Sequence, residues 1–188
     1  MRKVVYFMHV SLDGFVAGPN GEMDWVILND EMFDFVGQRT DQSDSALYGR
    51  KTWEMMDGYW PTAGDSPNAS KHAKVHSAWY NKIDKFVLSH TMKADPSKKV
   101  HVIGKDIAKE MNEIKTRPGK EILIFGSPTA AHSLMQLDLI DEFWMFVNPI
   151  LGGKGIPMFE GIKDKVKLKF ITSHVFDNGV VCMSYSKV

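Results

Sequence analysis

"LYGRKTWEMM", residues 47–56, is the stretch that decides the fold class of this chain. Residues 45–48 have the length and the apolar character of a short buried strand, and residues 50–56 are predicted to form a helix. Gly49 lies at the junction, where a residue without a side chain lets the backbone approach a ligand closely. A short strand that leads directly into a helix is a building unit of α/β proteins.

The same alternation continues along the chain. Apolar runs predict further strands at residues 4–10, 85–89, 100–103, 122–125 and 142–147. Helical spacing and capping residues predict helices at residues 30–39, 70–80, 106–115 and 128–137. Two more strands, at residues 167–176 and 180–187, flank the hairpin signal Asp177-Asn178-Gly179. Segments rich in glycine or proline are expected to be loops, at residues 13–25, 57–70 and 148–159.

This order of elements predicts a single α/β domain over residues 1–188. Parallel strands joined by helices require helices on both faces of the sheet. We therefore expect a three-layer α/β/α arrangement, with a mostly parallel central sheet and an antiparallel C-terminal hairpin at its edge.

Composition argues against several classes of function. Lys plus Arg and Asp plus Glu number 23 each, so the chain lacks the basic excess of a dedicated nucleic-acid binder. No apolar run is long enough to cross a bilayer. Cys182 is the one cysteine, which rules out a disulfide within the chain and fits a reducing, cytoplasmic location. The seven histidines are scattered, and the pair His72 and His76 has no evident third ligand, so no metal site is expected.

Three strand-to-helix junctions carry small or polar residues, and ligands of open α/β sheets bind at such junctions. The first is Gly49-Arg50-Lys51-Thr52, where helix N–H groups, a guanidinium and a hydroxyl could bind phosphate. The second is Ser89-His90-Thr91, which would suit another anion, such as the 2′-phosphate that separates NADP from NAD. Taken alone, each of these two junctions is more simply explained as an ordinary turn with solvated charges.

The third junction is Gly126-Ser127-Pro128-Thr129, which precedes a helix whose N-terminus favours anions. No dinucleotide-binding glycine fingerprint is present, and Gly152-Gly153-Lys154-Gly155 lacks the ending of a P-loop. The loop over residues 11–25 is long enough to close over a ligand. A carboxylate near it, such as Asp30, could bind a heterocyclic ring or relay a proton, although Asp30 taken alone is more simply explained as a favourable charge at a helix start.

Five segments in this order resemble the dihydrofolate-reductase-like superfamily, most closely the stand-alone proteins similar to the RibD C-terminal (riboflavin biosynthesis reductase) domain. The resemblance spans nearly the whole chain. The segments that carry it are SLDGFVAGPNGEMDW (11–25), LYGRKTWE (47–54), FVLSHT (86–91), ILIFGSPTAAHSL (122–134) and NPILGGKGIPMFEG (148–161).

The resemblance implies that the chain binds NADPH. The family's segment for the adenylate-side phosphates is matched by Gly49, Arg50, Lys51 and Thr52, and its segment for the 2′-phosphate by Ser89 and His90. The turn against the pyrophosphate and nicotinamide is matched by Gly126, Ser127, Thr129 and Ala130. The mobile loop over the nicotinamide ring is matched by Val16 and Ala17. In dihydrofolate reductases the turn at 126–127 is Gly-Gly with a cis bond, whereas this chain has Gly-Ser.

The resemblance also implies a function. Asp30 falls at the position of the carboxylate that binds folate, and Trp25 and Phe33 would wall the substrate pocket, or could be core aromatics. The expected activity is hydride transfer from NADPH to a C=N or C=O group of a small heterocyclic or pyrimidine-ribityl substrate, as in 5-amino-6-(5-phosphoribosylamino)uracil reductase, and a homodimer is expected. Two alternatives remain open: a true dihydrofolate reductase, and an NADP-binding sensor or scaffold without catalysis.

Overall fold

The structure is a computed structural model that describes residues 1–188. The chain folds into two compact units. Unit 1 comprises Met1–Arg2 and Asp30–Leu123, and unit 2 comprises Lys3–Asn29 and Ile124–Val188. The division falls within strand β6 (Glu121–Phe125), so this strand belongs in part to each unit. None of the helices has both the length and the apolar character needed to cross a membrane.

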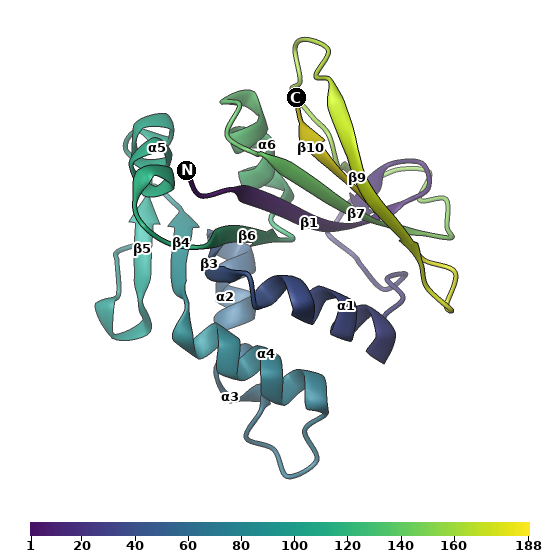
Figure 1. The fold of residues 1–188 in the computed structure, drawn as a ribbon, viewed down its shortest axis with the longest axis horizontal. Helices are drawn as coiled ribbons and strands as arrows, with labels where there is room; N and C mark the ends of the chain where they lie inside the picture. Colours follow the sequence, from purple (N-terminus) through teal and green to yellow (C-terminus); the bar gives the residue numbers. More distant parts are fainter. The chain divides into compact units, whose positions relative to one another are not determined.

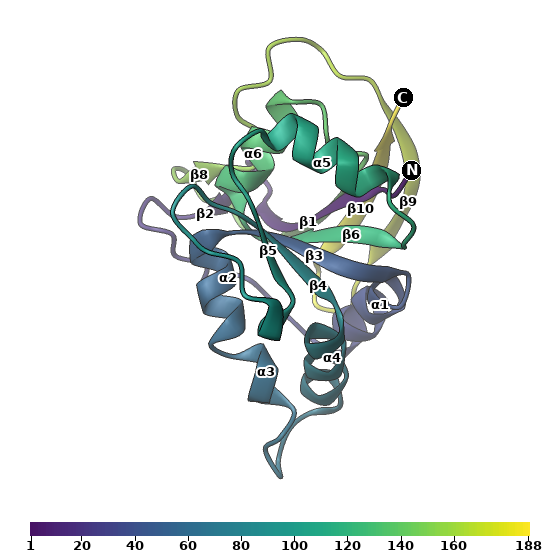
Figure 2. The same cartoon turned by 90° about the vertical axis from the view of Figure 1, so that its left-hand side faces the viewer.

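Unit 1 is an alternating array of strands and helices. Its elements are α1 (Asp30–Thr40), β3 (Ser43–Gly49), α2 (Arg50–Asp57), α3 (Trp60–Ala63), α4 (Lys71–Lys82), β4 (Asp84–Leu88), the short 3₁₀ helix η1 (Pro96–Lys98), β5 (Val100–Ile103) and α5 (Ile107–Thr116). The strands lie in the order β5-β4-β3-β6. Strands β3, β4 and β5 pair in parallel and lie side by side in Figure 2, with Val87 of β4 opposite both Tyr48 and Val102. Their continuous apolar runs are buried, as expected for parallel strands.

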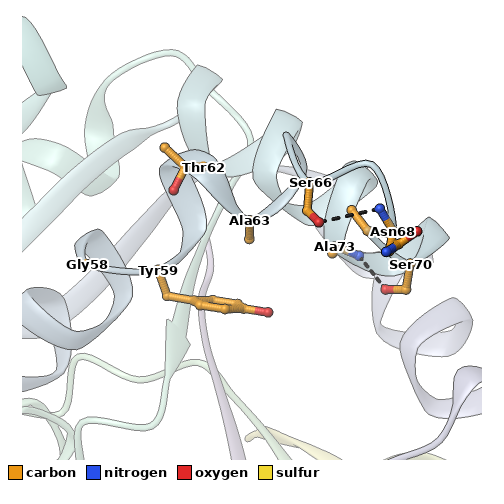
Figure 3. A pocket seen from close by; sticks show the side chains of 9 residues that line it. Gly58, Tyr59, Thr62, Ala63, Ser66, Asn68, Ser70 and Ala73 are labelled. Carbon is orange, nitrogen blue, oxygen red and sulfur yellow. Dashed lines mark hydrogen bonds between the residues drawn. The ribbon is translucent and has the colours of Figure 1, made fainter.

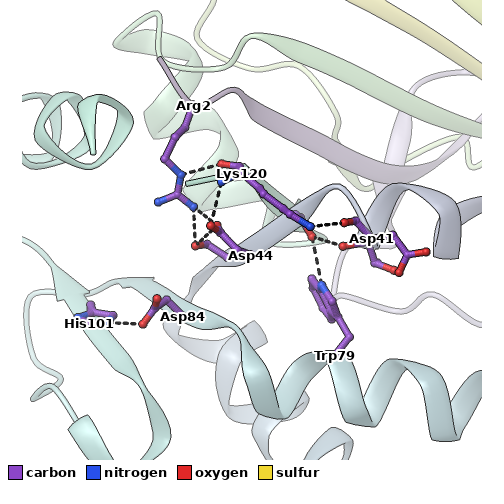
Figure 4. Close-up of polar contacts among 10 residues, drawn as sticks. Arg2, Asp41, Asp44, Trp79, Asp84, His101 and Lys120 are labelled. Atoms are coloured by element: carbon purple, nitrogen blue, oxygen red, sulfur yellow. Dashed lines mark hydrogen bonds and ion pairs between the residues drawn. The ribbon is translucent and has the colours of Figure 1, made fainter. Parts of the chain in front are cut away.

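Polar side chains fix the ends of the unit 1 elements. Ser70 caps α4, because its hydroxyl accepts a hydrogen bond from the Ala73 N–H at 3.1 Å. Arg2 forms an ion pair with Asp44 at the start of β3 and donates to the Lys120 carbonyl oxygen at 2.7 Å, and Lys120 N–H donates back to Asp44 at 2.8 Å (Figure 4). Three segments that lie far apart in the sequence are therefore joined through one carboxylate.

Unit 2 contains the remaining strands and helix α6. Its elements are β1 (Val4–Ser11), β2 (Phe15–Ala17), α6 (Pro128–Gln136), β7 (Glu142–Asn148), β8 (Ile156–Pro157), β9 (Leu168–Val175) and β10 (Val181–Lys187). The strand order is β6-β1-β7-β10-β9. Strands β1 and β7 are parallel, whereas β10 is antiparallel to both β7 and β9 (Figure 1, β9 and β10 in yellow).

The α/β class, the mostly parallel sheet and the antiparallel C-terminal hairpin are confirmed. Four short elements were not expected, and one of them is the 3₁₀ helix η1. Helix α3 lies within residues 57–70, and strands β2 and β8, which lie in the two other predicted loops, pair with each other. Elements of two to four residues have no periodicity of their own to detect, and a pairing such as that of Ala17 with Ile156 depends on contacts distant in sequence.

Candidate functional site

The first predicted junction, in unit 1, is an uncapped helix start. Strand β3 ends at Gly49, and α2 begins at Arg50. Gly49 is the N-cap residue in an extended conformation, with φ −76° and ψ 156°, and no side chain caps the helix. Because the first N–H groups of a helix have no partner within it, this end offers donors to an anion. Arg50 and Lys51 are exposed beside it, and Thr52 is partly buried.

Arg50 is engaged only weakly within the protein. Its Nη1 lies 3.5 Å from Glu54 Oε1, one turn along α2, and both side chains are about half exposed, at 48% and 51%. Such an exposed pair is screened by water and contributes little to stability. The guanidinium can therefore leave Glu54 and bind a phosphate without a large cost to the fold.

The second junction, after β4, is a capped turn. Ser89 Oγ accepts hydrogen bonds from the Thr91 N–H at 3.2 Å and the Met92 N–H at 3.1 Å. A Cβ added to Gly104 would lie 2.3 Å from the Ser89 carbonyl oxygen, so a glycine is needed there to accommodate the turn. The side chain of His90 is exposed. The Ser89 hydroxyl oxygen thus already has hydrogen-bond partners within the turn. The exposed His90 is the group that an anion could reach.

The third junction, in unit 2, has an unusual backbone. Gly126 has φ +62° and Ser127 has φ +55°, ψ +51°, so two consecutive residues adopt the left-handed conformation, and the bond between them is trans. For a residue with a side chain, such as Ser127, this conformation costs about 1–2 kcal/mol. Strain of this kind concentrates at functional sites. Helix α6 follows at Pro128, with Thr129 exposed and Ala130 buried in its first turn.

The loop that resembles the nicotinamide-covering segment forms strand β2. The side chains of Val16 and Ala17 are buried, with 0% and 5% exposed, and β2 pairs with β8. A Cβ added to Gly155 would lie 2.0 Å from the Ala17 carbonyl oxygen, so the two chains approach too closely for any side chain there. Any contact that this segment makes with a ligand would therefore come mainly from its backbone.

Asp13 ties this segment to the glycine-rich loop that precedes β8. Its carboxylate accepts hydrogen bonds from the Ser11 hydroxyl at 2.7 Å and from the N–H groups of Gly152 and Gly153, both at 2.8 Å. These hydrogen bonds lower the pKa of Asp13 to about 2, and the bond from Ser11 makes the largest contribution. The Gly152-Gly153 stretch thus binds a carboxylate of the chain itself.

The residues predicted to contact substrate lie in both units. Asp30 is exposed at the first position of α1, and the ring of Phe33, one turn further on, stacks on His72 of α4 at 3.7 Å between centroids. This stack accounts for Phe33 as a packing residue between α1 and α4, which lie side by side in Figure 1. Trp25, in unit 2, is partly buried.

Sequence reasoning did not select His9 and Asn148. They lie near the carboxyl ends of the parallel strands β1 and β7, and His9 Nδ1 is 3.2 Å from Asn148 Nδ2. The available signal was a polar residue near the carboxyl end of each of two mainly apolar strands.

Two surface pockets lie in unit 1, apart from the predicted junction residues. The larger, of about 450 Å³, is lined by α3, the segments on either side of it and the start of α4, including Tyr59, Ser66 and Asn68 (Figure 3). The other, of about 370 Å³, lies between α1 and α4 and includes Phe33 and His72. Phe33 is the one predicted site residue that lines either pocket.

Comparison with known proteins places the chain in a family. Residues 2–182 match the model of the RibD C-terminal domain. The uncharacterized protein YyaP of Bacillus subtilis (strain 168) is 33% identical over 187 residues, which cover 98% of this chain and 94% of YyaP.

Solved structures share the fold. A candidate riboflavin biosynthesis protein from Shewanella sp. PV-4 superimposes with a TM-score of 0.75 at 24% identity, covering 100% of this chain and 99% of the other. The Thermotoga maritima diaminohydroxyphosphoribosylaminopyrimidine deaminase/5-amino-6-(5-phosphoribosylamino)uracil reductase gives 0.67 at 16% identity, with coverage of 100% and 57%. Dihydrofolate reductase from Enterococcus faecalis, complexed with NADP(H) and RAB-propyl, gives 0.59 at 15% identity, with coverage of 98% and 96%. With a family match that extends over almost its whole length, this chain belongs to the RibD C-terminal domain family.

Proposed function

We propose that this protein is an NADPH-dependent reductase that acts on a C=N or C=O group of a small heterocyclic substrate of the pyrimidine-ribityl type. Membership of the RibD C-terminal domain family supports the reductase class. The observation that carries the proposal is the helix start at Gly49, where an uncapped N-terminus coincides with two exposed cations, Arg50 and Lys51. Such a site suits phosphate groups.

Each unit, taken by itself, has donor groups that suit part of a dinucleotide. In unit 1, Arg50 and the N–H groups at the start of α2 would bind a phosphate, and His90 would lie near the 2′-phosphate. In unit 2, the left-handed turn at Gly126-Ser127 would contact the pyrophosphate and the nicotinamide. Thr129, in the first turn of α6, would donate a hydrogen bond to the cofactor. When bound, NADPH supplies the hydride, and the protein orients the reactants and excludes water.

On the substrate side, Asp30 is the proposed polar anchor. Its carboxylate is exposed at the start of α1, so it is accessible to a ligand without rearrangement of the helix. It would orient the heterocycle through a hydrogen bond or assist its protonation. Trp25 would contribute an aromatic wall in unit 2, and the stack of Phe33 on His72 supports the packing role for Phe33 in unit 1.

A comparison of NADPH with NADH tests the cofactor assignment. Titration followed by cofactor fluorescence should show tighter binding of NADPH, because only NADPH carries the 2′-phosphate. Equal affinities would contradict the role given to His90, and no binding of either dinucleotide would contradict the proposed function.

Turnover separates the proposed function from its alternatives. Loss of NADPH absorbance with 5-amino-6-(5-phosphoribosylamino)uracil, and not with dihydrofolate, is the expected result. Efficient turnover of dihydrofolate would instead identify a dihydrofolate reductase. Tight NADPH binding without turnover of either compound would favour a sensor or scaffold.

A further inference from the structure

His9 holds a position at which a strand could meet a ligand. It lies on β1 opposite Phe146 of the parallel strand β7, two residues before β1 ends. Ligands of α/β sheets bind beyond the carboxyl ends of parallel strands. The imidazole is only partly exposed and stacks on the Phe146 ring, with 5.1 Å between centroids and 25° between planes. The side chain therefore has one preferred position.

The side-chain amide of Asn148 has only one possible orientation. The backbone N–H of Ile27 donates to Asn148 Oδ1 at 3.0 Å, and Asn148 Nδ2 donates to the Phe146 carbonyl oxygen at 2.9 Å. A backbone N–H can only donate and a carbonyl oxygen can only accept, so a flipped amide would lose both hydrogen bonds. Asn148 is fully buried, and such a loss would be costly.

The orientation of Asn148 fixes the tautomer of His9. The remaining N–H of Asn148 Nδ2 donates to His9 Nδ1 at 3.2 Å, so Nδ1 must accept and the proton of the neutral ring lies on Nε2. Burial lowers the pKa of His9 to about 4, which keeps the ring neutral near pH 7. His9 Nε2 makes no hydrogen bond within the protein, so its proton is available to another molecule.

We infer that His9 is a substrate-binding residue whose Nε2–H donates a hydrogen bond to a carbonyl oxygen or ring nitrogen of an uncharged, flat heterocycle. This inference rests on the proposed function and narrows its substrate class. An uncharged donor beside aromatic rings favours a neutral acceptor, because a phosphate or carboxylate would gain no ion pair there. The buried rings of Phe7 and Phe146, with centroids 6.2 Å apart on the same strand pair, make the surroundings of the donor apolar.

The tautomer can be measured without any ligand. A long-range ¹H–¹⁵N correlation spectrum at pH 7 should show His9 as the Nε2–H form. Asn148→Asp replaces the amide donor with a carboxylate that can only accept, so His9 should then carry a proton on Nδ1. An Nδ1–H tautomer in the unmodified protein would overturn the inference.

Binding of a neutral pyrimidinedione tests the donor itself. The probe is 5-aminouracil, titrated into the protein in the presence of saturating NADP⁺. His9→Phe retains a ring and removes the donor, and the expected result is an affinity about tenfold lower. His174→Phe, which changes another partly exposed histidine of unit 2, is the matched control and should leave the affinity unchanged.

The outcomes separate this inference from the proposed function. In the unmodified protein the His9 Nε2–H resonance should shift when 5-aminouracil is added, a readout that does not depend on how well a variant folds. No shift, no binding of the probe, or equal affinities for the unmodified protein and His9→Phe would each overturn the role of His9. Failure to bind NADPH would instead contradict the proposed function.

Discussion

Two junctions with the same local sequence pattern adopt different backbones. In "LYGRKT" and in "IFGSPT", an apolar strand, a glycine and a helix follow one another. Gly49 is extended, with φ −76°, a conformation open to any residue, whereas Gly126 has φ +62°. The first junction bears two exposed cations, and the second has a buried, left-handed Ser127.

The difference shows that the two glycines serve different purposes. At Gly49 the backbone does not require glycine, so the binding of an anion there is left to charge. At Gly126 the conformation itself selects glycine, since a side chain there would be strained. Binding at the unit 1 junction should therefore depend on charge, and the unit 2 turn should depend on backbone shape.

The largest expected effect is on cofactor affinity at the charged junction. Arg50→Ala should weaken NADPH binding by about 1.5–3 kcal/mol, at least tenfold, because it removes a hydrogen bond between charged groups. Fluorescence titration measures the change. Lys74→Ala, which removes one positive charge from the exposed surface of α4 in the same unit, is the control and should have little effect. If Arg50→Ala binds NADPH as the unmodified protein does, the phosphate assignment at this junction is wrong.

A smaller effect should separate the two glycines by stability. Gly126→Ala should lower the free energy of unfolding by about 1–2 kcal/mol, because alanine is disfavoured in the left-handed conformation. Gly49→Ser should change it by only a few tenths of a kcal/mol, since serine is a favoured N-cap residue in an extended conformation. Urea denaturation measures both variants. Equal losses would remove the distinction between the junctions.

The smallest effect concerns the hydrogen bonds that tie down the β2 segment of unit 2. The folded-state pKa of Asp13, about 2, lies below the ordinary value of about 3.9, so its carboxylate stabilises the fold above pH ~4. This stabilisation is lost as the pH falls toward 2. Asp13→Asn should therefore have a lower Tm than the unmodified protein near neutral pH, and the difference should shrink in acid.

Thermal melts across this pH range measure that difference. Asp24→Asn, which changes another exposed aspartate of the same unit, is the matched control. Because it leaves the hydrogen bonds of Asp13 in place, its Tm near neutral pH should stay close to that of the unmodified protein. A Tm difference for Asp13→Asn that stays constant from neutral pH down to the lowest pH would contradict the role of the carboxylate.

Much of the fold could be predicted from sequence, because its signals are local. The apolar runs at β3 and β7 have strand length, Ser70 has the chemistry of an N-cap, and Asp177-Asn178-Gly179 is a turn sequence. Cys182 lies in the second strand of the predicted hairpin and is buried in β10. For the candidate site, sequence indicated which strand ends carry polar groups, and these groups follow the ends of β3, β4 and β6.

The features of the candidate site that depend on long-range contacts could not be predicted. His9 acquires a defined tautomer only because Asn148 reaches it from β7, and the orientation of Asn148 depends in turn on the backbone of Ile27. Asp13 finds its partners at Gly152 and Gly153, more than a hundred residues away. Such hydrogen bonds leave no periodic mark on the sequence.

The sequence by itself determined the alternation of strands and helices, the buried apolar core and the places where polar residues leave the strands. Hydrophobic periodicity and turn chemistry act over a few neighbouring residues, so they can be read along the chain. Only the tertiary structure decided that Gly126 is left-handed while Gly49 is extended, that β2 pairs with β8, and that His9 presents an Nε2–H donor. These properties arise from hydrogen bonds and close approaches between distant segments, which form only when the chain is folded.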